Sequence, residues 1–289
     1  MQRSDEASHT VRSTRASITV REIRCKTILN RSPISDYSLN CYVGCAHGCI
    51  YCYARFMQRF HPHREAWGEF VDVKANAVEV LRRQLLRAKP GDVFVSSACD
   101  GWQPVEARWR LTRQCCELLV QHGFCVNALT KSSLVLRDLD VFARGSATIS
   151  VTVTTLDEKL SRLWEPRSAS VEERFRVIRE ARRAGLRTGI MFGPLLPYLS
   201  DNQESIDGLF ERAADLGIDS IAVDALNPRP RVWPSVARLL REKFPGLHGR
   251  CRRMLFDETV RREYLAGLGE RVAHAAERFQ MDERLVSCF

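Results

Sequence analysis

Three cysteines lie close together in the sequence: Cys45, Cys49 and Cys52, with the spacing C-x3-C-x2-C. With eleven cysteines in 289 residues, about 0.016 such triplets are expected by chance, so the spacing indicates a shared role. Three thiolates at this separation suit a soft metal ion or an iron–sulfur cluster. Because no obvious fourth cysteine follows, one iron of a [4Fe–4S] cluster would stay open, and an open iron indicates catalysis.

A structural zinc site is the alternative for the same loop. Zinc normally takes four ligands in a tetrahedron, and Cys41 or His47 could supply the fourth. However, the sequence lacks a second CxxC pair, and the triplet directly follows a predicted first strand at 38–43. The sequence therefore favours the cluster over zinc.

The composition is that of an ordinary globular chain. Hydrophobic residues make up 45% and charged residues 27%, which argues against global disorder. Lys and Arg number 44 against 35 Asp and Glu, a formal charge of +9, and a basic chain is compatible with a nucleic-acid partner. No stretch approaches about eighteen apolar residues, so no transmembrane helix is expected.

The first seventeen residues differ from the rest. Residues 1–17 are rich in Ser, Thr and Arg and lack the apolar segment of a secretory signal, so we expect a disordered tail. A mitochondrial transit peptide fits less well, because the segment contains Asp5 and Glu6. Without a secretory signal we expect a cytoplasmic protein whose thiols are reduced.

Short apolar segments alternate with helical patterns along the chain. Besides 38–43, strands are predicted at 93–96, 124–129, 147–151, 186–192 and 218–223. They are apolar enough to be buried on both faces. Gly123, Gly185 and Gly217 each separate a helical pattern from a strand, where a left-handed glycine ends the helix.

Repeated β–α units of this kind predict an α/β fold with a mainly parallel sheet. About six strands are too few for a closed eight-stranded barrel, so we expect a partial (β/α)6, TIM-like barrel with C-terminal helices. An open doubly wound sheet is the alternative. Helical patterns include 78–88, 171–182 and 256–280. We expect a core domain at 18–240 and a helical extension at 241–289 packed on it.

The triplet, with Tyr51 directly before its last cysteine, resembles the signature of the radical S-adenosylmethionine (SAM) superfamily. More narrowly, roughly residues 20–240 resemble the spore-photoproduct-lyase-like branch. The segments that carry this likeness are KTILNRSPISDYSLNCYVGCAHGCIYCYAR (26–55), SSACDGWQPVE (96–106), ALTKSSLVLRDLD (128–140), TVTTLDEKLSRLWEPR (152–167) and GPLLPYLSDNQESI (193–206).

This resemblance implies a [4Fe–4S] cluster with Cys45, Cys49 and Cys52 as ligands and SAM on the fourth iron. One electron from the cluster would cleave the sulfonium of SAM, and the resulting 5′-deoxyadenosyl radical would abstract a hydrogen atom from the substrate. The resemblance also implies a one-electron reductant, such as a flavodoxin or a ferredoxin, as partner.

Residues after the predicted strands would bind SAM, as sites in such barrels collect at the carboxyl face. By the resemblance, Tyr51 lies against the adenine, the loop after the second strand holds the methionine amine, Thr152 contacts the ribose or carboxylate, and Arg174 pairs with a carboxylate. The full implied set is Tyr51, Ser96, Ser97, Asp100, Lys131, Thr152 and Arg174. Taken alone, Tyr51 could instead be a core aromatic, and Lys131 or Arg174 a surface charge.

Cys99 is a candidate catalytic residue. Spore photoproduct lyases carry a hydrogen-donating cysteine in about this loop, although that position aligns nearer to Ser97. Cys41 stands where the branch usually has proline, and Cys115 and Cys116 are expected in the core.

The resemblance implies a lyase-like radical SAM enzyme acting on a DNA lesion or a modified nucleotide. The same radical chemistry on a protein or a small metabolite is the first alternative. A non-catalytic, metal-stabilised nucleic-acid-binding protein is the second, although no known nucleic-acid-binding module is recognisable.

Overall fold

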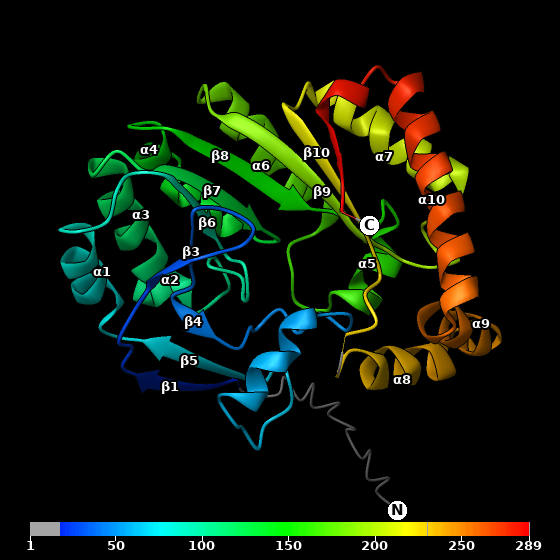
Figure 1. Ribbon diagram of the computed structural model, residues 1–289, viewed down its shortest axis with the longest axis horizontal. Helices are drawn as coiled ribbons and strands as arrows, with labels where there is room; N and C mark the ends of the chain where they lie inside the picture. The colour runs from blue at the N-terminus through cyan, green and yellow to red at the C-terminus, as the bar shows by residue number, and fades with distance from the viewer. Residues whose placement is uncertain (1–17, 230, 289) are drawn as a thin grey trace, which may run out of the picture.

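The main sheet is built from consecutive β–α units. In the computed structural model, which describes residues 18–229 and 231–288, six parallel strands lie side by side in the order in which the chain forms them (Figure 1). They are β3 (Tyr37–Leu39), β6 (Asp92–Val95), β7 (Cys125–Thr130), β8 (Ala147–Thr152), β9 (Arg187–Leu195) and β10 (Ser220–Ala225). A doubly wound sheet reverses its strand order at a switch point. This sheet does not, which excludes that alternative.

One further strand flanks each edge of the six. The strand β2 (Leu29–Arg31) pairs antiparallel with β3, and β11 (Leu285–Ser287) pairs parallel with β10. These two outer strands are at opposite ends of the sheet order and do not pair with each other. The predicted α/β fold with a partial barrel is therefore confirmed, and the barrel is open.

A smaller sheet corrects the prediction for residues 38–43. This segment is not one strand, because the chain leaves the main sheet after β3 and forms β4 (Tyr42–Val43), which pairs antiparallel with β5 (Phe70–Lys74). The strand β1 (Thr19–Ile23) pairs with the other side of β5. The strand β1 falls in residues 18–40, for which a mixture of strand and loop was expected, whereas β5 was not predicted.

Helices follow the main strands, and Figure 1 shows α3, α4, α6 and α7 along one side of the sheet. Gly123, Gly185 and Gly217 have φ angles of +75°, +75° and +61°, which confirms the predicted helix ends. The helices are α1 (Ala77–Leu85), α2 (Glu106–Trp109), α3 (Leu111–Gln121), α4 (Leu139–Phe142), α5 (Glu158–Trp164), α6 (Val171–Arg183), α7 (Gln203–Leu216), α8 (Trp233–Lys243), α9 (Pro245–Phe256) and α10 (Glu258–Arg278), with 3-10 turns η1 (Tyr53–Arg59), η2 (Ser133–Asp138) and η3 (Asp282–Arg284).

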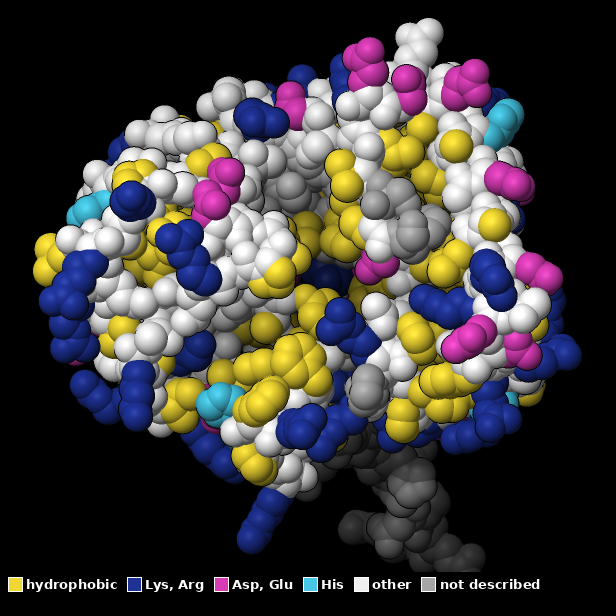
Figure 2. Space-filling view, viewed as in Figure 1, with side chains coloured by type: hydrophobic (Ala, Val, Ile, Leu, Met, Phe, Trp, Pro, Cys, Tyr) yellow, Lys and Arg dark blue, Asp and Glu magenta, His cyan; other side chains and the backbone are white. Residues whose placement is uncertain are grey.

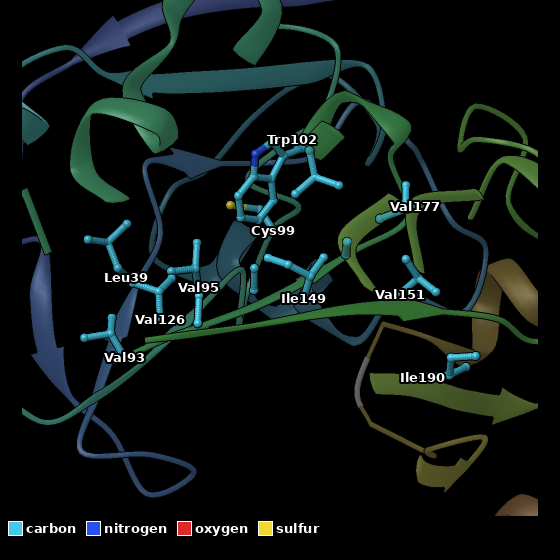
Figure 3. Close-up of a cluster of buried hydrophobic side chains, with 14 of the residues drawn as sticks. Leu39, Val93, Val95, Cys99, Trp102, Val126, Ile149, Val151, Val177 and Ile190 are labelled. Atoms are coloured by element: carbon cyan, nitrogen blue, oxygen red, sulfur yellow. The ribbon is translucent and has the colours of Figure 1, made fainter. Parts of the chain in front are cut away.

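The core lies between the sheet and these helices. Figure 3 shows side chains from successive strands pointing into it. Val95 of β6, Val126 of β7 and Ile149 of β8 are each at most 1% exposed, and Val177 of α6 is fully buried. At roughly 1.5–3 kcal/mol for each fully buried Val or Ile side chain, this layer supplies the main favourable term in folding.

The opposite face of the sheet is not buried in the same way, which corrects the expectation that the strands are buried on both faces. Along β7 and β10, buried and half-buried residues alternate without exception. A closed barrel fills its interior with bulky branched side chains. Here the inner face carries small and polar residues such as Asn127, Ser150 and Ser220, and it stays partly open.

The C-terminal region packs on the core, but it is not helical throughout. Leu268, Val272 and Ala275 of α10 are buried in the main core cluster, and α10 contacts α7. The expected domain boundary at 240 falls inside α8, and 241–289 also contributes the edge strand β11. The tail expected at 1–17 lies outside the described residues. None of the helices that the structure describes has the length and hydropathy needed to cross a bilayer.

Candidate active site at the carboxyl edge of the sheet

The three cysteines lie in one tight loop between β4 and η1. Gly48 N donates a hydrogen bond to Cys45 O at 3.2 Å, and Cys52 N donates to Cys49 O at 3.3 Å. Gly48 has a φ of +64°, and a Cβ there would lie 2.5 Å from Nη2 of Arg167. The loop therefore requires glycine at this position.

Two other segments hold the loop in place. The fully buried Gln103, in the loop after β6, accepts from Ala46 N at 2.8 Å and donates to Gly44 O at 3.2 Å. Ile50 N donates to Trp164 O, at the end of α5, at 2.9 Å. Because buried backbone groups need hydrogen-bond partners, these contacts fix the path of the cysteine loop.

The thiols of the triplet lie in a buried environment near the cations Lys131 and Arg55. Burial raises the pKa of all three, and the Asp100 carboxylate raises that of Cys45 further. The Lys131 ammonium opposes this shift at Cys49 and Cys52. Metal ligation requires thiolates, so a positive charge beside the loop reduces the cost of forming them.

The side chains considered as a fourth zinc ligand are occupied elsewhere. Cys41 Sγ lies 3.8 Å from Cys115 Sγ in the core, and His47 Nδ1 lies 3.4 Å from Asp100 Oδ2. Within 18–229 and 231–288, no three His, Cys, Asp or Glu side chains are grouped so that one metal ion could bind them. A single zinc ion needs such a group, because its ligand atoms all lie about 2.0–2.3 Å from it. A cluster spreads three thiolates over three irons, and the triplet suits that arrangement.

Asp100 ties the end of β6 to the end of β7. Its Oδ1 accepts from Trp102 N at 2.9 Å and from Thr130 Oγ1 at 2.7 Å, and its Oδ2 accepts from Lys131 N at 2.8 Å. The His47 ring faces the same Oδ2. The carboxylate is therefore engaged by protein groups on both oxygens, and it positions the residues that follow the two strands.

A buried ion pair lies beneath the cysteine loop. Arg174 Nη2 lies 2.6 Å from Glu165 Oε2, and both side chains are at most 1% exposed. Arg174 also donates to Thr152 O and to Ser168 Oγ, each at 3.0 Å. The Tyr51 hydroxyl donates to the other oxygen of Glu165. This network joins the cysteine loop to the ends of β8, α5 and α6.

Lys131 is a cation of the site that has no close carboxylate among the described residues. Its Nζ lies 5.9 Å from the centre of the Tyr51 ring, and among the described residues no carboxylate comes within 4.0 Å of it. Burial lowers the pKa of Lys131, but the neighbouring Cys49, Glu165 and Asp100 raise it more, so the net shift is upward. The side chain is therefore an ammonium without a close ion-pair partner.

The loop after β6 presents two hydroxyls and a buried thiol. Ser96 Oγ accepts from Gly101 N, and Ser97 Oγ accepts from the Asn40 amide, each at 2.8 Å. These contacts leave the hydroxyl hydrogens of both serines available. The Cys99 thiol donates to Tyr42 O at 3.0 Å, and burial raises its pKa to about 12.

The structure thus brings every predicted site residue to one edge of the sheet. The profile of the radical SAM superfamily matches residues 39–210, a segment that contains all of these site residues. The chain belongs to the radical SAM superfamily.

Related proteins agree with this membership. A protein of Mycobacterium bovis is 32% identical over 237 residues, covering 76% of this chain and 69% of its own length. Spore photoproduct lyase of Clostridium acetobutylicum is 24% identical over 200 residues, covering 68% and 57%. A solved spore photoproduct lyase with bound AdoMet and dinucleoside spore photoproduct superposes with a TM-score of 0.68 at 15% identity, over 94% of this chain and 82% of that one. The expected likeness to the spore photoproduct lyase branch is therefore confirmed at the level of the fold.

Membership of the radical SAM superfamily implies a [4Fe–4S] cluster and SAM as cofactors. The residues present fit them, since the loop offers three thiols and no fourth, beside the Lys131 ammonium, which lacks a close ion-pair partner in the described part of the chain. Sequence reasoning missed Gln103, which holds the cysteine loop, Asn40, which bonds the loop after β6, and Arg167, which donates to Gly68 O. All three lie in or beside the motif segments, but nothing local in the sequence shows that their partners are Gly44, Ser97 and Gly68.

Proposed function

We propose that this protein is a lyase-like radical SAM enzyme that acts on a DNA lesion or a modified nucleotide. When bound at Cys45, Cys49 and Cys52, the cluster supplies the electron that cleaves SAM to a 5′-deoxyadenosyl radical for hydrogen abstraction. One observation carries the proposal: three buried thiols on a rigid loop face an ammonium, Lys131, that has no close carboxylate partner among the described residues.

The other side chains divide into groups that touch SAM and groups that position them. Lys131 receives the carboxylate of SAM, because a free ammonium forms a strong charge-assisted hydrogen bond. Tyr51 lies beside the adenine, and the free hydroxyl hydrogens of Ser96 and Ser97 face the methionine end. By contrast, the side chains of Asp100 and Arg174 already bond to protein groups, so they position the SAM-binding residues. Thr152 accepts from Arg174 only through its backbone carbonyl, and its hydroxyl stays among the groups that contact SAM.

Replacing Lys131 with methionine tests the assignment. Loss of a charge-assisted hydrogen bond costs about 1.5–3 kcal/mol, so the Kd for S-adenosylhomocysteine should rise roughly 10- to 150-fold by calorimetry, with iron content unchanged. Lys159→Met, at an exposed position of α5, is the matched control and should bind as the wild type does. Equal affinity in both variants would show that Lys131 does not bind the carboxylate.

A nucleic-acid substrate is supported by the relatives and by charge. The structural neighbour named above holds a dinucleoside spore photoproduct, and the net charge of +9 favours a polyanion. Lys and Arg side chains are spread around the rim of the face shown in Figure 2. A protein or small-metabolite substrate is the second candidate, because the same hydrogen abstraction does not depend on the substrate class.

Anaerobic reconstitution followed by isotope transfer tests the whole proposal. A protein with about four irons that forms 5′-deoxyadenosine under dithionite is a radical SAM enzyme, whereas one zinc and no cleavage fits the non-catalytic alternative. Deuterium transfer from labelled UV-damaged DNA or tRNA into 5′-deoxyadenosine would identify a nucleic-acid substrate. Transfer only from the protein or small-molecule fraction of a labelled extract would refute it. A flavodoxin or ferredoxin should replace dithionite as the reductant.

Cys99 remains the proposed hydrogen donor. A thiol donor must keep its hydrogen, and a pKa raised to about 12 by burial keeps Cys99 protonated at neutral pH. We expect Cys99→Ala to lower the product yield while 5′-deoxyadenosine still forms, as measured by chromatography of both products. Full product yield from this variant would rule Cys99 out.

A further inference from the structure

The open inner face of the sheet carries one carboxylate that the proposed chemistry does not use. Cross-strand registers place Ser150, Gly189 and Ser220 in one row, and Thr152, Met191 and Ala222 in the next row toward the carboxyl edge. Because side chains alternate along a strand, Asp224 follows Ala222 on this same face, at the end of β10. Its strand neighbours Val223 and Ala225 point into the core and are buried.

The neighbouring strand approaches Asp224 closely. A Cβ at Gly193 of β9 would lie 3.1 Å from the Cβ of Asp224 and 3.3 Å from Cε of Met191, so a side chain at position 193 would crowd Asp224. Burial raises the pKa of Asp224, and a hydrogen bond from the Ala225 backbone and the charges of Arg261 and Arg229 only partly offset this rise. Within the described part of the chain, neither arginine comes within 4.0 Å of the carboxylate. A half-buried carboxylate without an ion-pair partner is costly, which is a reason to look for a ligand.

The position of Asp224 relates it to the cysteine loop. Leu226, two residues further on, packs in the same hydrophobic cluster as Cys49 and Tyr51. Arg229 lies over the ring of Tyr53, with its Cζ 5.8 Å from the ring centre. Figure 2 shows a hollow near the centre of this face, with a basic side chain in its depth. Asp224 in β10 and Lys131 directly after β7 lie at the same carboxyl edge of the sheet, three strand spacings or about 14 Å apart.

A carboxylate at this place restricts what can bind. It accepts hydrogen bonds and donates none when ionised, and it repels phosphate. The edges of nucleobases offer amino and imide N–H donors, which acidic side chains accept in protein–nucleic-acid complexes. Phosphates of the same ligand would find cations in the exposed Arg229 and its neighbours.

We propose that Asp224 is a specificity-determining residue that accepts a hydrogen bond from an N–H group on the edge of the substrate base. This inference rests on the proposed nucleic-acid substrate and adds to it the recognition of an unpaired base. The base must leave its stack to reach the opening, as enzymes that act on bases require.

Two single-stranded probes of equal charge test the inference. One is a fluorescent thymidine decamer, and the other is the same decamer with every thymine methylated at N3, which removes the imide N–H. We expect the reconstituted wild type to bind the methylated decamer at least about tenfold more weakly, by fluorescence anisotropy. Asp224→Ala and Asp224→Leu should bind the two probes within about twofold of each other. Ser220→Ala, on the same face of β10, should discriminate as the wild type does.

The outcomes separate the two proposals. If the wild type binds neither decamer, the nucleic-acid substrate and this inference both fail. If it binds them equally, or if both Asp224 variants keep the discrimination, this inference alone fails. Affinity for S-adenosylhomocysteine should stay at the wild-type value in at least one Asp224 variant, which also shows that it is folded. Loss of that affinity in both would assign Asp224 to the cofactor site or to the fold and overturn the inference.

Discussion

Replacing Cys49 with alanine is expected to abolish reductive cleavage of SAM. Cys49 lies in the middle of the triplet, and the loop that carries it is fixed at Gly44, Ala46 and Ile50 by contacts that do not involve its thiol. The variant should therefore fold and lose a cluster ligand. We expect 5′-deoxyadenosine formation to fall more than about 100-fold, beyond the usual effect of residues outside the metal's own ligands. Iron analysis, electron paramagnetic resonance and chromatography of the nucleoside measure the loss.

The matched control is another cysteine of the same chain. Cys125 is half-buried at the start of β7, at the edge of the sheet opposite the site, and its thiol accepts from Ser146 Oγ. Cys125→Ala should keep the iron content and the cleavage rate of the wild type. Wild-type iron content in Cys49→Ala would contradict the assignment of the triplet.

Arg174→Met should produce the largest loss of stability among the site variants. It leaves the buried carboxylate of Glu165 without its closest cation, and breaking a buried ion pair in this way costs about 3–5 kcal/mol. It also leaves the Thr152 carbonyl without the Arg174 donor. Denaturant unfolding measures the free energy of unfolding. Arg176→Met, at an exposed position on the same helix, should change it by less than about 0.5 kcal/mol.

The effect of Arg174→Met should shrink in acid. Burial alone would raise the pKa of Glu165, but Arg174 and Lys131 outweigh it and the net shift is downward. A lowered carboxylate pKa contributes stability that is present above the unfolded value, about 4.3, and is lost as the pH falls through the folded value. Without Arg174 the pKa of Glu165 rises, so Glu165 takes up a proton at higher pH and its burial costs less. The stability gap between variant and wild type should therefore be smaller at pH 4.5 than at pH 7. A gap independent of pH would show that the ion pair is not its cause.

Much of the fold follows from local features of the sequence. The glycines at 123, 185 and 217 end helices, and the apolar segments that follow them form β7, β9 and β10, respectively. These signals depend on a few adjacent residues, so they can be recognised in the sequence without a structure. The same holds for the cysteine triplet, whose chemistry is set by residue type and spacing within one loop.

Other features could be recognised only in part. The alternation of polar and apolar residues in β7 and β10 is visible in the sequence as CVNALT and SIAVDA. This alternation indicates an inner face that is partly open and that carries Asp224. The expectation that the strands are buried on both faces overlooked it. The segment 38–43 is equally strand-like throughout, and only its pairing with β5 divides it between two sheets.

The sequence by itself determined the superfamily and the parallel sheet, and it supplied the proposed cluster ligands, because each rests on short-range patterns. Only the tertiary structure decided which groups are free to bind a ligand. Tyr51 and Glu165 are 114 residues apart, and Gln103 and Gly44 are 59 apart. A hydrogen bond across such a separation depends on how distant segments pack, and many residues of the same type could form it. Packing therefore occupies Arg174 and Asp100 with protein partners, whereas Lys131 and Asp224 have no close ion-pair partner among the described residues.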